Sequence, residues 1–208
     1  MKKLLLCATV LVALLTTSFR LALGLAPGTM SPDERKFALD YYQKTKARLL
    51  KDLKGLSEAQ MNFRADTGRW SVYECTEHIA LSENMMWEWV QMAQKQAAAP
   101  EKRGEVKVTT DQLMKMMTDR SHKVKTMPPL EPEKKFPDTK AALDAFTSRR
   151  DSTIYYIRST QDDLRNHFVQ APFGTIDAYQ ALIMLAAHSE RHTLQIEEVP
   201  ADPNFPKQ

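Results

Sequence analysis

Apolar residues recur every three or four positions in four long stretches of the chain, which is the spacing of one face of an α-helix. Polar and charged residues fill the remaining positions, so each predicted helix has one apolar face to bury. The four long helices are expected over residues 31–55, 71–96, 140–166 and 175–198.

Helix-start signals support these assignments. Ser31-Pro32-Asp33-Glu34 and Ser71-Val72-Tyr73-Glu74 both read as capping boxes, in which the serine and the glutamate satisfy each other's backbone amides. Asp138 or Thr139 is expected to cap the third long helix, and Thr175 the fourth. A shorter helix is expected over residues 112–124.

Prolines and turn residues separate the helices. Residues 126–137 contain four prolines and are expected to be irregular, and Pro172-Phe173-Gly174 is expected to be a turn. No alternating run of β-branched residues is long enough to predict a sheet. The pattern therefore predicts an all-α protein, a four-helix bundle, with a non-helical tail over residues 200–208.

The first 26 residues have the order of a secretory signal. Lys2 and Lys3 precede an uncharged run over residues 4–19, and small residues follow at 22–26. Arg20 interrupts the run before it reaches the length of a membrane span, although an uncleaved N-terminal anchor stays open. We expect a signal peptide over residues 1–26, a bundle over 27–199, and an exported protein in the periplasm or outside the cell.

Charge and composition exclude several classes of protein. Three of the 29 Lys and Arg residues lie in the leader, so the remaining 26 balance the 26 acidic residues. A neutral body gives no electrostatic case for nucleic-acid binding. With 6 Gly, 11 Pro and 2 Cys, the chain is neither disordered, collagen-like nor a disulfide scaffold.

Three histidines occupy comparable positions on two of the predicted helices. His188 and His192 lie four residues apart and therefore on one helix face, where they continue an apolar seam. His78 lies on the apolar stripe of residues 71–96, about two turns from the start. If the two helices are antiparallel, the three rings lie at one level, and three imidazoles with an open position are typical of catalytic zinc-type sites. The residues alone leave open whether these are ligands or hydrogen-bonded core residues.

The same residues carry a resemblance to a known family. Trp70-Ser71-x-x-Glu74-x-x-x-His78, then Phe173-Gly174-Thr175 and His188-x-x-Arg191-His192-x-x-Gln195, resemble the DinB/YfiT-like superfamily of metalloenzymes. The resemblance implies a four-helix bundle of up-down-down-up connectivity. It also implies a divalent metal, commonly zinc or nickel, with His78, His188 and His192 as its ligands.

Residues beside the histidines have two interpretations each. Glu74 completes a capping box, but it is also a candidate base or an orienting partner of His78. Arg191 can pair with a carboxylate or an anionic substrate, and Gln195 can line the site or hydrogen-bond a ligand ring. Cys75 is expected in the core rather than as a fourth ligand. His122 is expected to be solvated, and His167 to lie at the end of the third long helix.

Three functions remain in competition at this stage. The first is an exported metal-dependent hydrolase, the second a metal-dependent thiol transferase, and the third a non-enzymatic helical interaction bundle. The expected partner is a small-molecule substrate that no motif identifies. Membrane contact is expected only through an uncleaved leader, and dimerisation through helix faces is left open.

Overall fold

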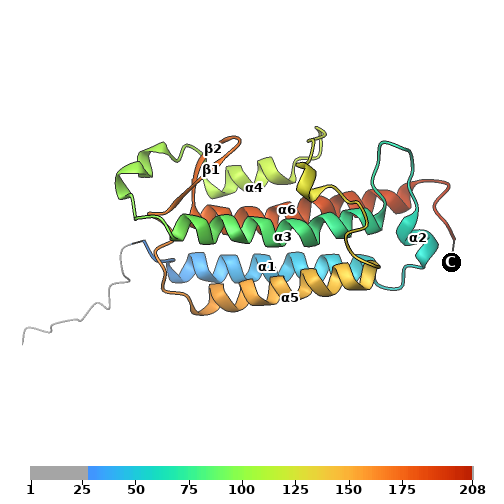
Figure 1. The fold of residues 1–208 in the computed structure, drawn as a ribbon, viewed down its shortest axis with the longest axis horizontal. Coiled ribbons are helices and arrows are strands. Elements are labelled where there is room, and N and C mark those ends of the chain that lie inside the picture. The colour runs from blue at the N-terminus through green and yellow to red at the C-terminus, as the bar shows by residue number, and fades with distance from the viewer. Residues whose placement is uncertain (1–27, 208) are drawn as a thin grey trace, which may run out of the picture.

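The computed structural model describes residues 28–207, so the predicted signal peptide lies outside the described residues. Four long helices form the bundle: α1 (Pro32–Leu53), α3 (Val72–Gln94), α5 (Thr139–Ser159) and α6 (Ala178–Glu198). Helices α1 and α6 run in one direction and α3 and α5 in the other (Figure 1). Helix α3 packs against α6 and α5, and α1 packs against the same two. The predicted all-α fold is thus confirmed, with up-down-down-up connectivity.

Reciprocal caps fix the helix starts. The backbone N–H of Glu34 donates to Ser31 Oγ at 3.2 Å, and the N–H of Ser31 donates to Glu34 Oε2 at 2.8 Å. The pair Ser71 and Glu74 repeats this arrangement at 3.2 and 2.8 Å. Each cap contributes roughly 1 kcal/mol to its helix, and both predicted capping boxes are confirmed.

The connections carry the short elements. Helix α2 (Glu58–Asn62) lies between α1 and α3. The long crossover over residues 95–138 contains the 3-10 helix η1 (Pro100–Glu105), helix α4 (Thr110–Thr118) and the 3-10 turn η2 (Pro128–Leu130). Helix α4 packs against α6. It ends six residues before the expected boundary of 124, because Arg191 takes the carbonyls of Met117 and Asp119 at its last turn.

Two further expectations about elements were wrong. The third long helix was expected to reach residue 166 but ends at Ser159, where Arg35 donates to the carbonyls of Ile157 and Thr160. The expectation of no sheet also fails. Strands β1 (Phe168–Ala171) and β2 (Gly174–Asp177) form an antiparallel hairpin. Consequently Asp177, not Thr175, caps α6.

The core lies between the four long helices and contains one buried ion pair. Arg150 of α5 donates to both carboxylate oxygens of Glu83 on α3, one of them at 3.1 Å, and neither side chain is more than 1% exposed. Its third nitrogen donates to Thr45 Oγ1 on α1 at 2.6 Å. The rings of Tyr42 and Phe146 lie 4.7 and 5.0 Å from the guanidinium carbon. These contacts join three helices through a single side chain.

The chain after α6 forms the short 3-10 turn η3 (Val199–Ala201) and then a tail that turns at residues 202–205. Phe205 of this tail packs edge-on against Phe63 with ring centroids 5.6 Å apart. Within residues 28–207, no helix combines the length and the apolarity that a bilayer crossing requires.

Candidate metal centre

The three histidines singled out by their spacing converge at one end of the bundle. His78 lies in the second turn of α3, and His188 and His192 lie in the last turns of the antiparallel α6. Their potential ligand atoms all lie within 4.8 Å of one another. The ring centroids are 5.0 Å apart for His78–His188, 4.3 Å for His78–His192 and 4.6 Å for His188–His192. The structure therefore brings the rings together, and their role as metal ligands stays a prediction.

Hydrogen bonds at Nδ1 determine which nitrogen of His78 and of His192 carries the lone pair. His78 Nδ1 lies 2.8 Å from the carbonyl oxygen of Leu130, an acceptor, so Nδ1 carries the proton. His192 Nδ1 lies 3.0 Å from Gln195 Oε1 and is protonated for the same reason. In a neutral ring this leaves the lone pair on Nε2. Both rings thus present the nitrogen that a metal needs.

The contact between His78 and His188 fits a shared cation. Their Nε2 atoms lie 3.3 Å apart. Two zinc ligands with bonds of 2.0–2.1 Å at a tetrahedral angle are separated by about 3.3–3.4 Å. Because His78 Nε2 carries a lone pair, it can accept a proton from His188 Nε2–H or share a metal ion with His188. The donor set and the spacing both fit a divalent metal.

Burial keeps the three imidazoles uncharged. It lowers the pKa of His78, and it lowers the pKa of His192 well below its ordinary value. Burial and the neighbouring His78 and Arg191 lower the pKa of His188 to about 3. Neutral imidazole is the form that binds metals. His188 is the member of the cluster that retains partial exposure.

An indole ring forms one wall of the cluster. Trp70 directly precedes the cap of α3, and its ring centroid lies 4.8 Å from that of His78 and 5.8 Å from that of His192. The planes of Trp70 and His192 are inclined by 29°. In the sequence, Trp70 was noted only as the first residue of the motif that resembles the family. Its contact with ring residues on two helices required the fold.

A buried carboxylate positions the loop that supplies the Leu130 carbonyl. Glu77 is fully buried on α3, one residue before His78. It accepts from the backbone N–H groups of Lys134 and Lys135 at 3.2 and 2.5 Å. The loop after η2 is therefore anchored to the helix that carries the histidine. Sequence reasoning missed Glu77, and its position next to His78 was the only signal available.

Glu74 is engaged away from the three rings. Besides the cap, its carboxylate accepts from both Arg64 Nε, at 2.8 Å, and Arg64 Nη2. Its two oxygens thus accept hydrogen bonds from Ser71 and Arg64. The expected capping role of Glu74 is confirmed. A role for Glu74 as a base stays a prediction.

Arg191 lies between two of the histidines in sequence but points to the crossover. It donates to the carbonyls of Met117 at 3.3 Å, of Asp119, and of His122 at 2.9 Å. The expected pairing of Arg191 with a carboxylate is wrong in this structure. Its guanidinium group instead donates hydrogen bonds to backbone carbonyls at and after the end of α4. Arg191 fastens residues 117–122 to α6.

The other candidates take structural positions. Cys75 is fully buried in the core, as expected. His122 is exposed, also as expected. His167 lies in the loop before β1 rather than at the end of α5, and its Nδ1 lies 3.0 Å from the carbonyl of Ala93 in the last turn of α3.

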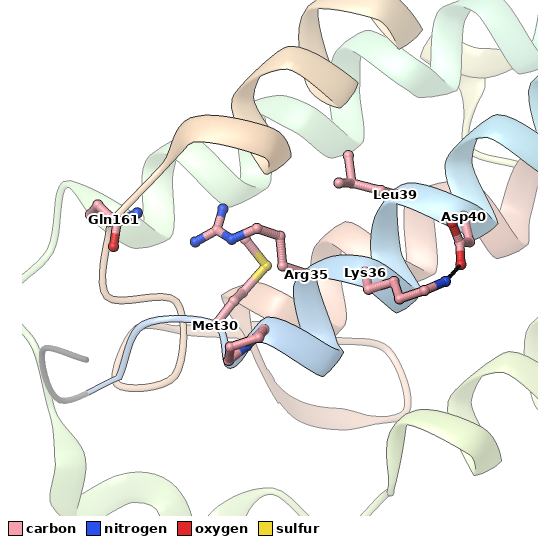
Figure 2. Close-up of a pocket in the computed structure, with 7 residues that line it drawn as sticks. Met30, Arg35, Lys36, Leu39, Asp40 and Gln161 are labelled. Atoms are coloured by element: carbon pink, nitrogen blue, oxygen red, sulfur yellow. Dashed lines mark hydrogen bonds and ion pairs between the residues drawn. The ribbon is translucent and has the colours of Figure 1, made fainter. Parts of the chain in front are cut away.

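A hollow lies at the opposite end of the bundle from the histidines, at the start of α1 and the end of α5 (Figures 1 and 2). Its volume is about 380 Å³. The charged groups in it already have partners: Arg35 donates to carbonyls at the end of α5. Lys36 pairs with Asp40, a contact that Figure 2 marks with a dashed line. Its lining residues are Met30, Pro32, Arg35, Lys36, Leu39, Asp40 and Gln161. The histidine cluster is therefore the stronger candidate site.

Comparisons with known proteins identify the family and support the fold. A family model described as the DinB superfamily matches residues 41–196. Among solved structures, YfiT from Bacillus subtilis is similar over 87% of this chain and 94% of its own, with 13% identity and a TM-score of 0.53. That protein is described as a probable metal-dependent hydrolase with an unusual four-helix bundle topology. At this identity the likeness establishes the fold. A search of curated proteins found no match.

Proposed function

Since this chain belongs to the DinB superfamily, we propose that it is a metal-dependent hydrolase whose divalent ion is held by His78, His188 and His192. The observation that carries the proposal is the convergence of these three side chains. In His78 and His192, hydrogen bonds at Nδ1 leave the lone pair on Nε2. Imidazole donors suit zinc and nickel, which we propose as the resident metals.

The residues around the cluster have distinct tasks in this proposal. When bound, a divalent ion in such a site acts as a Lewis acid and lowers the pKa of a water molecule or a thiol towards neutrality. The Leu130 carbonyl orients His78, and Gln195 orients His192. Trp70 excludes water from one side of the rings. Partial exposure of His188 leaves a direction from which a substrate approaches.

Hydrolysis is favoured over thiol transfer by two arguments. The similar structure of YfiT is described as a probable metal-dependent hydrolase. An exported protein also meets little of the small thiols that a transferase needs. A non-enzymatic bundle with structural histidines is the remaining alternative, and metal analysis distinguishes it.

Metal content of the purified protein tests the ligand set. We expect about one equivalent of zinc or nickel in protein expressed without chelator, and loss of that metal in His188→Ala and His192→Ala. The matched control is His122→Ala, which removes an exposed histidine outside the cluster and retains the metal. A metal-free wild-type protein that also fails to bind added zinc or nickel would refute the proposal.

Activity is tested on the same variants. We expect hydrolysis of at least one class in a panel of ester, amide and phosphoester substrates, abolished in His188→Ala and retained in His122→Ala. If the loaded protein is inactive on this panel but a small thiol changes the spectrum of its cobalt form, thiol transfer replaces hydrolysis.

We also propose that the chain is exported, with residues 1–26 removed as a signal peptide. The support is the order of Lys2 and Lys3, the uncharged run and the small residues. Expression of the full chain and N-terminal sequencing of the secreted product test this. Retention of the intact N-terminus in the membrane fraction would favour the anchored alternative.

A further inference from the structure

The amide of Gln195 decides which nitrogen of His192 carries the proton. An amide has two ends of nearly equal size, an oxygen that accepts and an NH₂ group that donates. With the oxygen towards His192, Nδ1 carries the proton and Nε2 keeps its lone pair. With the NH₂ group towards the ring, Nδ1 accepts, the proton moves to Nε2, and that nitrogen no longer binds a metal. The orientation of the Gln195 amide therefore determines whether His192 Nε2 can bind a metal.

Arg120 removes this ambiguity. Its Nη1 lies 3.3 Å from Gln195 Oε1, the same oxygen that lies 3.0 Å from His192 Nδ1. A guanidinium group donates only, so the atom that faces it must be an acceptor. The oxygen thus faces both Arg120 and His192, and the NH₂ group faces away.

Two residues hold Arg120 in place, Glu198 by direct contact and Arg191 through the backbone on either side. Glu198 on α6 accepts from Arg120 Nε at 2.7 Å and from Nη2 at 2.8 Å, which leaves Nη1 for Gln195. Arg191 binds the carbonyls of Met117, Asp119 and His122, on either side of Arg120 in the chain. Arg120 therefore approaches Gln195 from a segment that is fixed to α6 itself.

His78 needs no such arrangement. Its Nδ1 faces the backbone carbonyl of Leu130, which accepts and has no donating end to turn towards the ring. Only His192 depends on a side-chain amide. We propose that Arg120 is a positioning residue that fixes the tautomer of His192 by fixing the orientation of the Gln195 amide. Its consequence for metal affinity rests on the proposed function, whereas the tautomer itself is a property of the metal-free protein.

The variants isolate this effect. Arg120→Met removes the donors and keeps an unbranched apolar stem. Arg48→Met is the matched control, because Arg48 makes the same two-pronged contact with Glu197, at 2.6 and 2.7 Å, without contacting Gln195. Gln195→Glu in the Arg120→Met background restores a group that only accepts.

Two measurements follow the variants. Long-range ¹H–¹⁵N correlation spectra of histidine-labelled, metal-free protein report which ring nitrogen of His192 is protonated. Competition with a chromophoric chelator gives the zinc dissociation constant. Circular dichroism confirms that each variant folds. Glu198→Ala, which removes both oxygens that hold Arg120, is measured in the same way should Arg120→Met not fold.

We expect wild type and Arg48→Met to show only the Nδ1–H form of His192, and Arg120→Met to show a mixture of both forms. Zinc binding weakens roughly tenfold in Arg120→Met, the usual effect of losing a partner behind a ligand, and Gln195→Glu restores both readouts. An unchanged tautomer in Arg120→Met overturns the inference. If wild type binds no zinc, the proposed function fails, and the tautomer measurement still decides the role of Arg120.

Discussion

Replacing Glu83 with leucine leaves the Arg150 guanidinium buried without its carboxylate. Both side chains are almost fully buried, and the pair shares two hydrogen bonds between α3 and α5. The hydroxyl of Thr45 and the carbonyl of Tyr42 remain as acceptors, but neither carries a charge. We therefore predict a large loss of stability from this single change.

The magnitude follows from the burial. Removing one partner of a buried ion pair costs about 3–5 kcal/mol. For a chain of this size, 1 kcal/mol shifts the melting temperature by roughly 2–4 °C, so the expected loss is about 6–20 °C. Replacing both partners, with Arg150→Met added to Glu83→Leu, removes both charges and leaves an apolar core. Thr45 keeps the carbonyls of Tyr41 and Tyr42 as partners, so the double variant should lie close to wild type.

Urea denaturation of the wild type, both single variants and the double variant gives the coupling energy. We expect each single variant to lose several kcal/mol and the coupling to recover at least about 3 kcal/mol. The matched control is the exposed pair Lys140 and Asp144, where the same treatment should change the free energy of unfolding by less than about 0.5 kcal/mol. Additive losses in the Glu83 and Arg150 double variant would show that the burial argument is wrong.

Four further predictions concern the site and its surroundings. Glu77→Gln should lower the free energy of unfolding by about 1–3 kcal/mol, measured in urea, because its carboxylate binds two backbone amides; an unchanged midpoint would contradict this. Metal-free protein should lose stability as pH falls from 6.5 towards about 3, since the lowered pKa of His188 means that the unfolded chain binds the proton first; denaturation midpoints against pH should fall less steeply in His188→Ala. Burial raises the pKa of the Cys75 thiol, so iodoacetamide at pH 8 should label it only in urea, as peptide mapping would show. Zinc at 100 times its dissociation constant should stabilise the protein by about 2.7 kcal/mol in thermal melts, and this gain should be absent in His192→Ala.

The parts of the fold that local sequence controls were predictable. A cap involves residues three apart, so Ser31 with Glu34 and Ser71 with Glu74 identified the helix starts without tertiary information. Histidine spacing on α6 gave two of the three clustered rings. The third followed from the assumption that α3 and α6 are antiparallel.

The parts that distant residues control were not predictable. Helix α5 ends early because Arg35, more than 120 positions away, takes its last carbonyls. The hairpin strands have only four residues each, too few for an alternating pattern. Asp177, at the end of β2, is held by Arg165 at 2.8 Å. The carbonyl of Leu130 contacts His78, and Arg120 contacts Gln195 behind His192. Both residues belong to the crossover, and nothing local in the sequence links them to the histidines.

Because α3 and α5 run in the same direction, the chain after α3 must travel back along a helix about 34 Å long before α5 begins. Residues 95–138 span this distance. In the same segment, Leu130 contacts His78 and Arg120 contacts Gln195. Two of the groups around the cluster, the Leu130 carbonyl and Arg120, are thus encoded in the crossover, apart from the long helices that carry the rings themselves.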